Sequence, residues 1–157
     1  MFIGLLTVVL YLFVYTPLKK RSSLNTFVGA IPGALPILGG WAANGSDIHV
    51  VSWAFFLVLF CWQHPDFYAL AVVHRDDYAA AGLKMLPVLD STLVITRVQI
   101  VLYTVLMIIA SMIPFLMSFL GVTYVIGMIV ISILFIVFVG RFLLRPDRLN
   151  ARFLFIQ

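Results

Sequence analysis

Residues 122–144 read VTYVIGMIVISILFIVFVGRFLL, and this run decides the class of fold. It carries a single charged residue, Arg141, close to its end. A helix needs about 20 mostly apolar residues to cross the hydrocarbon core of a bilayer. The run therefore predicts a helix that spans a membrane.

Four more apolar runs precede it along the chain. They cover residues 2–18, 24–43, 50–73 and 98–120. A further run starts near Ala151 and is too short to cross a bilayer before the sequence stops. We expect an all-α, polytopic transmembrane bundle with five full spans and an incomplete sixth, forming one domain over residues 1–157.

The composition of the whole chain excludes a soluble domain. Of its 157 residues, 64% are hydrophobic and 10% are charged, whereas a soluble domain is about half apolar and about a quarter charged. A chain of this size cannot hide so much apolar surface in its own core. The long continuous runs also argue against a membrane β-barrel, whose strands alternate apolar and polar residues. The one cysteine, Cys61, excludes an intrachain disulfide and a cysteine-clustered metal site.

The basic residues are confined to alternate connections between the apolar runs. They are Lys19, Lys20, Arg21, Arg75, Lys84, Arg97, Arg141, Arg145, Arg148 and Arg152. The connections at 44–49 and 119–123 contain none. This is the pattern of the positive-inside rule. We therefore expect an integral membrane protein whose basic loops face the cytoplasm, with Met1 on the far side and no nucleic-acid partner.

The connection after the run 50–73 carries a pair of acidic residues. Asp76 and Asp77 fall where a helix would leave the membrane on the basic side. Paired carboxylates at such a position can hold Mg²⁺, which takes oxygen ligands and often bridges to the phosphates of a substrate. The alternative is that they are solvated charges that balance Arg75 and Lys84.

Lys19, Lys20 and Arg21 form a second charged cluster on the same side. Arginine offers a forked set of donors and lysine a point charge, so this cluster is able to bind a diphosphate. The alternative is a positive-inside anchor without a ligand.

Glycine and proline interrupt the run 24–43. Gly29 and Gly33 have the spacing that lets two helices approach closely. Pro32 and Pro36 remove backbone hydrogen bonds, so we expect this helix to be broken or bent. Irregular backbone at membrane depth is tolerated where it lines a cavity or is buried in protein. The run is thus interpreted either as a cavity wall or as a tight packing face.

Gln63, His64 and Asp66 lie inside the run 50–73. Polar and ionisable groups within a membrane are costly and are candidates for a functional role. Gln63 and Asp66 share one helix face at i, i+3, whereas His64 points elsewhere. We expect His64 to be a satisfied polar group rather than a haem or metal ligand.

Two long motifs resemble those of the protoheme IX farnesyltransferases, or haem O synthases, of the intramembrane prenyltransferase superfamily. The first reads YTPLKKR at 15–21, SLNT at 23–26 and GAIPGALP at 29–36. The second reads WQHPDFYALA at 62–71 and RDDYAAAGLKMLPV at 75–88. The resemblance covers the whole chain in order. It implies a helical bundle around a central cavity, with Mg²⁺ and a prenyl diphosphate bound in polar regions on the cytoplasmic side.

The resemblance also implies an activity and its residues. Farnesyl would pass from farnesyl diphosphate to the vinyl group of haem B, giving haem O and diphosphate for terminal oxidases. By motif position, the metal ligands would be Asp77 and Asp76, the diphosphate would be bound by Lys19, Lys20 and Arg75, and Asn25, Thr26, Tyr78 and Gln63 would contact the substrates. Haem A synthase or the terminal-oxidase assembly machinery would be partners, in a bacterial or archaeal cell membrane or the mitochondrial inner membrane.

The sequence departs from the family pattern at two places. Asp66 stands where the family usually has His, while His64 is two residues earlier. The first aspartate-rich motif of the superfamily is missing, because no Asp precedes Asp47. We therefore expect roughly the C-terminal half of such an enzyme, lacking its N-terminal helices. A sister prenyltransferase with a quinone or other aromatic acceptor, and a non-catalytic membrane half-bundle, are the alternatives.

Overall fold

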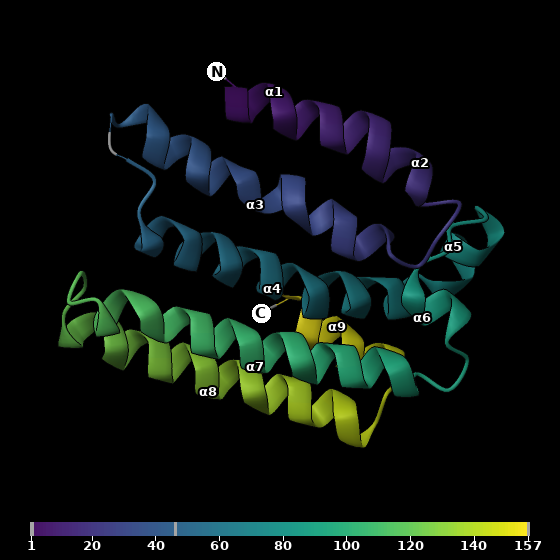
Figure 1. The fold of residues 1–157 in the computed structure, drawn as a ribbon. Coiled ribbons are helices and arrows are strands. Elements are labelled where there is room, and N and C mark those ends of the chain that lie inside the picture. Colours follow the sequence, from purple (N-terminus) through teal and green to yellow (C-terminus); the bar gives the residue numbers. More distant parts are fainter. Residues whose placement is uncertain (1, 46, 157) are drawn as a thin grey trace.

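The structure, a computed structural model, describes residues 2–45 and 47–156, and within them every regular element is a helix. The elements are α1 (Phe2–Val9), the π-helical turn η1 (Leu10–Tyr15), α2 (Thr16–Leu18), α3 (Asn25–Ala43), α4 (Val50–Val73), α5 (Arg75–Ala80), α6 (Leu86–Leu89), α7 (Val94–Leu116), α8 (Val122–Leu144) and α9 (Arg148–Ile156). The long helices lie side by side, with the connections gathered at two ends (Figure 1). The expected all-α class is confirmed.

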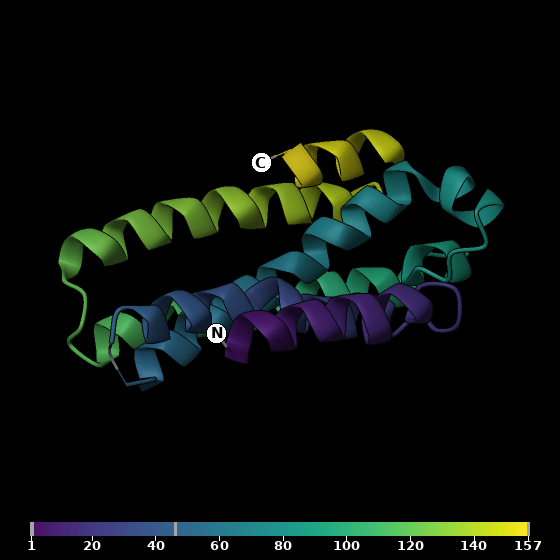
Figure 2. The same cartoon turned by 90° about the horizontal axis from the view of Figure 1, so that it is seen from above.

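Within residues 2–45 and 47–156, four helices, α3, α4, α7 and α8, are long and apolar enough to cross a membrane. The first expected span forms over Phe2–Leu18 as an apolar helix that is shorter than these four. It consists of α1, η1 and α2 in direct succession. The expected incomplete sixth span forms the short helix α9, which turns back against α4 (Figure 2).

The helix α7 begins and ends about one turn before the expected span at 98–120. At its start, the carboxylate of Asp90 accepts hydrogen bonds from the backbone N–H of Thr96 at 2.8 Å and from its hydroxyl at 3.0 Å. Leu93, at the N-cap position of α7, forms no side-chain cap bond, so Asp90 from the preceding connection satisfies one of the first N–H groups of the helix, which have no partner within it. At the other end, Ser118 adopts a positive φ of 55°, and the carbonyl of Pro114 accepts from Phe119 at 2.9 Å. Local polar contacts thus set both boundaries.

The helix α3 runs without interruption through Pro32 and Pro36, so it is not broken, and a bend at the prolines stays a prediction. In the interior of a helix each proline removes one backbone bond. A break would leave further N–H and C=O groups unpaired, and lipid offers no partner for them. Pro32 is buried, and α3 packs against both α1 and α4. The neighbouring helices therefore hold the chain helical.

The helix α4 is the centre of the bundle, since it packs against α3, α7 and α9. In Figure 2 it runs obliquely from the layer of α1, α3 and α7 to the layer of α8 and α9. The core joins α4, α7, α8 and α9 and includes Ala69, Val72, Ile100, Phe142 and Leu154. The side of α4 that faces α1 and α3 is left for the candidate site.

The two ends of the bundle differ in charge, as expected. All ten Lys and Arg residues lie in the connections at one end or in the helical turns that adjoin them. The connections between α3 and α4 and between α7 and α8, at the opposite end, have none (Figure 1). The start of α1 points toward the end that has no Lys or Arg. Met1 itself lies outside the described residues.

Candidate functional site

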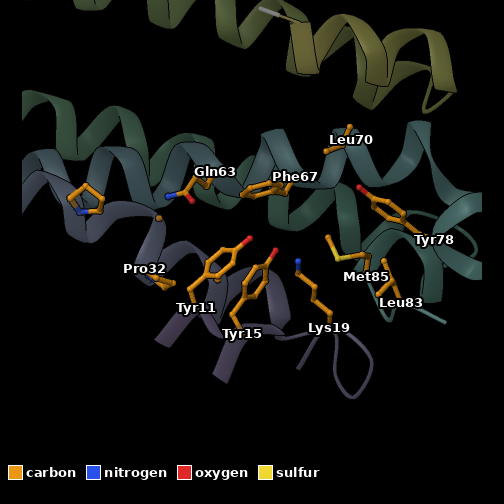
Figure 3. Close-up of a pocket in the computed structure, with 13 residues that line it drawn as sticks. Tyr11, Tyr15, Lys19, Pro32, Gln63, Phe67, Leu70, Tyr78, Leu83 and Met85 are labelled. Atoms are coloured by element: carbon orange, nitrogen blue, oxygen red, sulfur yellow. The ribbon is translucent and has the colours of Figure 1, made fainter. Parts of the chain in front are cut away.

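A cavity of about 490 Å³ lies between the first helical segment, α3 and α4, and reaches α5 and the chain that follows it. The side chains and glycines that line it are Tyr11, Tyr15, Lys19, Gly29, Pro32, Gly33, Pro36, Gln63, Phe67, Leu70, Tyr78, Leu83 and Met85 (Figure 3). Its walls are mostly apolar, with a few polar heads among them. This is the usual make-up of a small-molecule site.

One wall comes from η1 and the residues after it. The rings of Tyr11 and Tyr15 lie 5.2 Å apart, and the ammonium of Lys19 lies 4.4 Å from the centre of the Tyr15 ring. The two hydroxyls and the ammonium point into the cavity toward Gln63 and Phe67 (Figure 3). No carboxylate of the described residues forms an ion pair with Lys19. This wall therefore offers one cation and two hydroxyls to a ligand.

The π-helical turn explains how these side chains come together. The Thr16 hydroxyl donates to the carbonyl of Tyr11 at 2.8 Å, which ties the wider turn closed. Single π turns within helices occur often at functional sites. Tyr11, Tyr15 and Lys19 are also spaced at i, i+4 and i+8, so they share one helix face.

Gln63 faces this wall from α4. Its Nε2 donates to the carbonyl of Ala30 at 3.3 Å and to that of Leu59 at 3.1 Å. These bonds hold the amide against α3, and its Oε1 has no donor among the described residues. A side chain on Gly33 would overlap the Gln63 amide. Because Gly33 has no side chain, the Gln63 amide can pack against α3 at this position.

Gly29 leaves room for the Tyr15 ring, as Gly33 does for the Gln63 amide. A Cβ built on Gly29 would lie 2.5 Å from Cε2 of Tyr15. Gly29, Pro32, Gly33 and Pro36 all line the cavity, so the interpretation of α3 as a cavity wall is confirmed. The two glycines admit side chains of neighbouring helices.

Asn25 and Thr26 lie behind the cavity wall. The Nδ2 of Asn25 donates to the carbonyl of Ser22 at 2.7 Å and to that of Lys84 at 2.9 Å. The hydroxyl of Thr26 donates to Oδ1 of Asn25 at 3.3 Å. Both side chains are buried. Their contacts fasten the loop after Lys19 to the chain that leads into α6, and substrate contact by these two residues stays a prediction.

The acidic pair lies at the basic end on α5. Both side chains are largely exposed; Asp76 forms an ion pair with Arg148, and the carboxylate of Asp77 lies 3.2 Å from Nδ1 of His74. Tyr78, next along the helix, lines the cavity. Desolvation raises the pKa of the Tyr78 hydroxyl, and the charge of Asp77 adds to this rise. The pair thus lies beside a residue of the cavity wall.

Two of the predicted basic residues lie away from the cavity lining. The Nη2 of Arg75 donates to the backbone carbonyl of Asp90 at 3.2 Å, which links α5 to the start of α7. Lys20 is exposed and does not line the cavity. Of the basic residues predicted to bind diphosphate, Lys19 is the one that the structure places on the wall.

His64 is fully buried on the other side of α4. Its Nδ1 lies 2.8 Å from the carbonyl of Phe60, and its ring stacks on Tyr103 with 3.5 Å between the ring centres. Its Nε2 has no partner among the described residues. The expectation of a fully satisfied group is therefore only half met, and His64 does not line the cavity. Asp66 is half-buried, and no ion pair forms with it within the described chain.

Some lining residues were not among the candidates from sequence. Tyr11, Tyr15, Phe67, Leu70 and Met85 contribute rings or apolar groups to the cavity. The i, i+4 spacing of Tyr11, Tyr15 and Lys19 is a signal that was available. The placing of Met85 depends instead on a long-range contact, in which the N–H of Lys84 donates to the carbonyl of Lys19 at 2.8 Å.

Comparisons with known proteins point to one family. The model of the UbiA prenyltransferase family matches residues 1–157. The chain is 41% identical to a protoheme IX farnesyltransferase of Solibacter usitatus over 96% of its own length and 51% of that relative. It is 40% identical to proteins of the same name from Koribacter versatilis, over 83% of the chain and 42% of the relative, and Salinibacter ruber, over 80% and 44%. The chain thus spans about half the length of the curated relatives it matches. No solved structure matched it.

Proposed function

Because the chain belongs to the UbiA prenyltransferase family, we propose that it is part of an enzyme that transfers a farnesyl group from farnesyl diphosphate to haem B. The names of its relatives support this reaction. The observation that carries the proposal is the position of Lys19, which forms no ion pair within the described residues and lies among rings at the polar end of an apolar cavity. Such a cavity fits a substrate with an anionic head and a long apolar tail.

The cavity suggests how the diphosphate substrate lies. Lys19 follows α2 at the basic end, whereas Pro32 and Pro36 line the cavity farther along α3. In the proposed complex, the ammonium of Lys19 binds the diphosphate as a point charge. The prenyl chain then runs beside the two prolines, away from the basic end and deeper into the membrane.

The chemistry requires charge neutralisation and a dry site. The C–O bond to the diphosphate breaks with its electron pair leaving on oxygen, and the vinyl π electrons of haem form the new C–C bond. After this transfer, a water molecule adds to the cation left on the other vinyl carbon and loses a proton, so that the product side chain carries a hydroxyl. Lys19 stabilises the negative charge that develops on the leaving diphosphate. The faces of Tyr11, Tyr15 and Phe67 favour a nearby allylic cation through their ring quadrupoles. The apolar walls exclude water that would otherwise capture that cation.

A divalent cation fits the site only when substrate phosphates complete its coordination. Among the described residues, no three His, Cys, Asp or Glu side chains are grouped to enclose a metal. Mg²⁺ commonly uses one or two carboxylates together with substrate phosphates and waters. Asp77 and Asp76 do not line the cavity themselves, and Asp76 pairs with Arg148. They would hold Mg²⁺ in that mode only together with the diphosphate. The bound cation would add positive charge at the leaving group.

The rest of the assignment follows from the same proposal. We place the basic end in the cytoplasm, by the positive-inside rule. The resemblance implies a further aspartate-rich motif that residues 1–157 do not contain, and in this proposal the chain would supply one part of the catalytic site. Haem A synthase and the terminal-oxidase assembly machinery are the partners that would take up the product.

Binding and product formation test the proposal in two steps. The purified chain is titrated with farnesyl diphosphate with and without Mg²⁺, and Lys19→Gln is compared with Lys20→Gln. We expect Mg²⁺-dependent binding that weakens about tenfold in Lys19→Gln, because a charge-assisted contact of ~1.5 kcal/mol is lost. Lys20→Gln removes the same charge from an exposed position outside the cavity and should leave binding unchanged.

The second step measures the product. The chain is produced together with the remaining half of the Solibacter usitatus relative, and membranes are examined for farnesylated haem by mass spectrometry. Farnesylated haem supports the proposal, and a prenylated quinone in its place would identify the sister activity. A chain that neither binds farnesyl diphosphate nor restores any prenylated product would be the non-catalytic half-bundle.

A further inference from the structure

A second hollow, of about 320 Å³, lies between α7 and α8 near the basic end. It is lined by Val94, Arg97, Val98, Val101 and Leu143, and we call it the α7–α8 groove. None of these residues lines the cavity of the candidate site. The groove is therefore a separate feature that the proposed reaction does not use.

The groove opens on the exposed face of α7. Thr96 and Ile100 are fully buried on the face of α7 toward the bundle core, whereas Val98 is 60% exposed and Val101 is 38% exposed. Residues 94, 98 and 101 share a helix face because they are spaced at i, i+4 and i+7. In a bilayer, this face meets acyl chains.

Arg97 places a positive charge at the head of this apolar groove. Its Nε donates to the carbonyl of Leu93 at 3.2 Å, and its Nη1 makes a longer contact with the carbonyl of Leu143 at 3.5 Å. A guanidinium has five N–H donors, so three are left. In the described part of the chain, no carboxylate forms an ion pair with Arg97.

The nearest acidic residue in sequence does not neutralise Arg97. The carboxylate of Asp90 accepts from the hydroxyl of Thr92 and from both the backbone and the hydroxyl of Thr96. Thr96 lies on the buried face of α7, so Asp90 is engaged away from the groove. The free donors of Arg97 are thus available to an anion from outside the chain.

We propose that the α7–α8 groove binds one anionic phospholipid. The phosphate of the headgroup accepts hydrogen bonds from the free N–H groups of Arg97, and one acyl chain lies along Val98 and Val101. Both requirements, a negative head and an apolar tail, are met by a lipid at the membrane surface. Basic pockets between transmembrane helices are known to hold anionic lipid headgroups. The forked guanidinium suits phosphate better than a lysine ammonium would.

Lipid titration of the detergent-solubilised 157-residue chain, followed by native mass spectrometry, tests this proposal. Phosphatidylglycerol is compared with phosphatidylcholine of the same acyl chains. We expect the chain to bind phosphatidylglycerol about fivefold more tightly than phosphatidylcholine, because one basic residue near a membrane surface contributes about 1 kcal/mol to binding an anionic lipid. Arg97→Gln should abolish this preference.

Arg141→Gln is the matched control. Arg141 lies near the end of α8 that contributes Leu143 to the groove. Its guanidinium, however, lies 5.7 Å from the Phe153 ring of α9 and outside the groove. Both substitutions remove one positive charge. Equal loss of phosphatidylglycerol binding in the two variants would show attraction to overall charge and would overturn the proposal.

Val98→Trp separates binding from the structural contacts of Arg97. The indole fills the groove from an exposed position and leaves the charge and both backbone bonds of Arg97 in place. We expect it to remove the phosphatidylglycerol preference while circular dichroism and gel filtration match the unsubstituted chain. Retained preference in this variant, equal affinity for the two lipids, or a lipid-free dimer that buries the groove would each refute the assignment.

Discussion

Gly29 tests whether the cavity wall is built as the structure shows. A Cβ on Gly29 would lie 2.5 Å from Cε2 and 2.6 Å from Cδ2 of Tyr15. Non-bonded carbon atoms pack at about 3.5–4.0 Å, so Gly29→Ala must displace a rigid ring. Gly40 lies on the same helix and has open space where its Cβ would be. Gly40→Ala is therefore the matched control.

The expected magnitude follows from two opposing effects. Overpacking in a well-packed region costs about 1–3 kcal/mol, while Gly→Ala inside a helix gains about 1 kcal/mol. Gly29→Ala should therefore lower the free energy of unfolding by up to about 2 kcal/mol, and Gly40→Ala should raise it by about 1 kcal/mol. In a chain that already carries Tyr15→Ala, the ring is absent, and Gly29→Ala should become as favourable as Gly40→Ala.

The assay is equilibrium unfolding of the 157-residue chain in mixed micelles, with sodium dodecyl sulfate as denaturant and helicity as the signal. The four variants of Gly29 and Tyr15 form a double-mutant cycle. We expect a coupling energy of about 1–3 kcal/mol, equal to the relieved overpacking. If Gly29→Ala stabilises the chain as much as Gly40→Ala while Tyr15 is present, the ring does not lie against α3 and the wall is wrongly assigned.

Two further predictions concern Gln63 and Asp90. Gly33→Ala displaces the Gln63 amide from two backbone carbonyls. In the same unfolding assay, it should lower stability by about 1 kcal/mol with Gln63 present and raise it by about as much in a Gln63→Ala chain. Desolvation opposes ionisation of Asp90, but its hydrogen bonds from Thr96 and Thr92 prevail and hold its pKa below the usual value. The contribution of Asp90 to the free energy of unfolding is therefore present at neutral pH and is lost as pH falls below about 4. Asp90→Ala should lower that free energy by about 1–2 kcal/mol at pH 7 and weaken its fall between neutral and acid pH. An unchanged fall in the variant would contradict the role given to Asp90.

The fold could be predicted from sequence because membrane helices depend on local properties. Uninterrupted apolar length predicts a span, and the segregation of basic residues predicts which connections share an end. Both depend only on residues close in sequence. The start of α7 was missed because it lies before the apolar run, at Val94. There the Asp90 carboxylate accepts from the N–H of Thr96 in the first turn of the helix.

The candidate site could be predicted only in part, because its residues come together through long-range contacts. Lys19, Gln63 and Tyr78 were named from motifs, and all three line the cavity. Asn25 belongs to a motif as well, yet its side chain bonds to Lys84, which is 59 positions away. Nothing in the local pattern distinguishes an amide that faces a ligand from one that ties two loops together.

The glycines of α3 have a spacing that is visible in the sequence and a role that depends on long-range contacts. Gly29 and Gly33 have the spacing found where two helices lie in close contact. In the structure, the space that their missing side chains leave is occupied by Tyr15 at Gly29 and by Gln63 at Gly33. Both inserted groups carry a polar atom that reaches the cavity, and Lys19 lies over the ring of Tyr15. A larger residue at either glycine would therefore move a polar head of the site without touching a ligand. The requirement for glycine at these positions follows from the shape of the cavity wall rather than from the approach of two backbones.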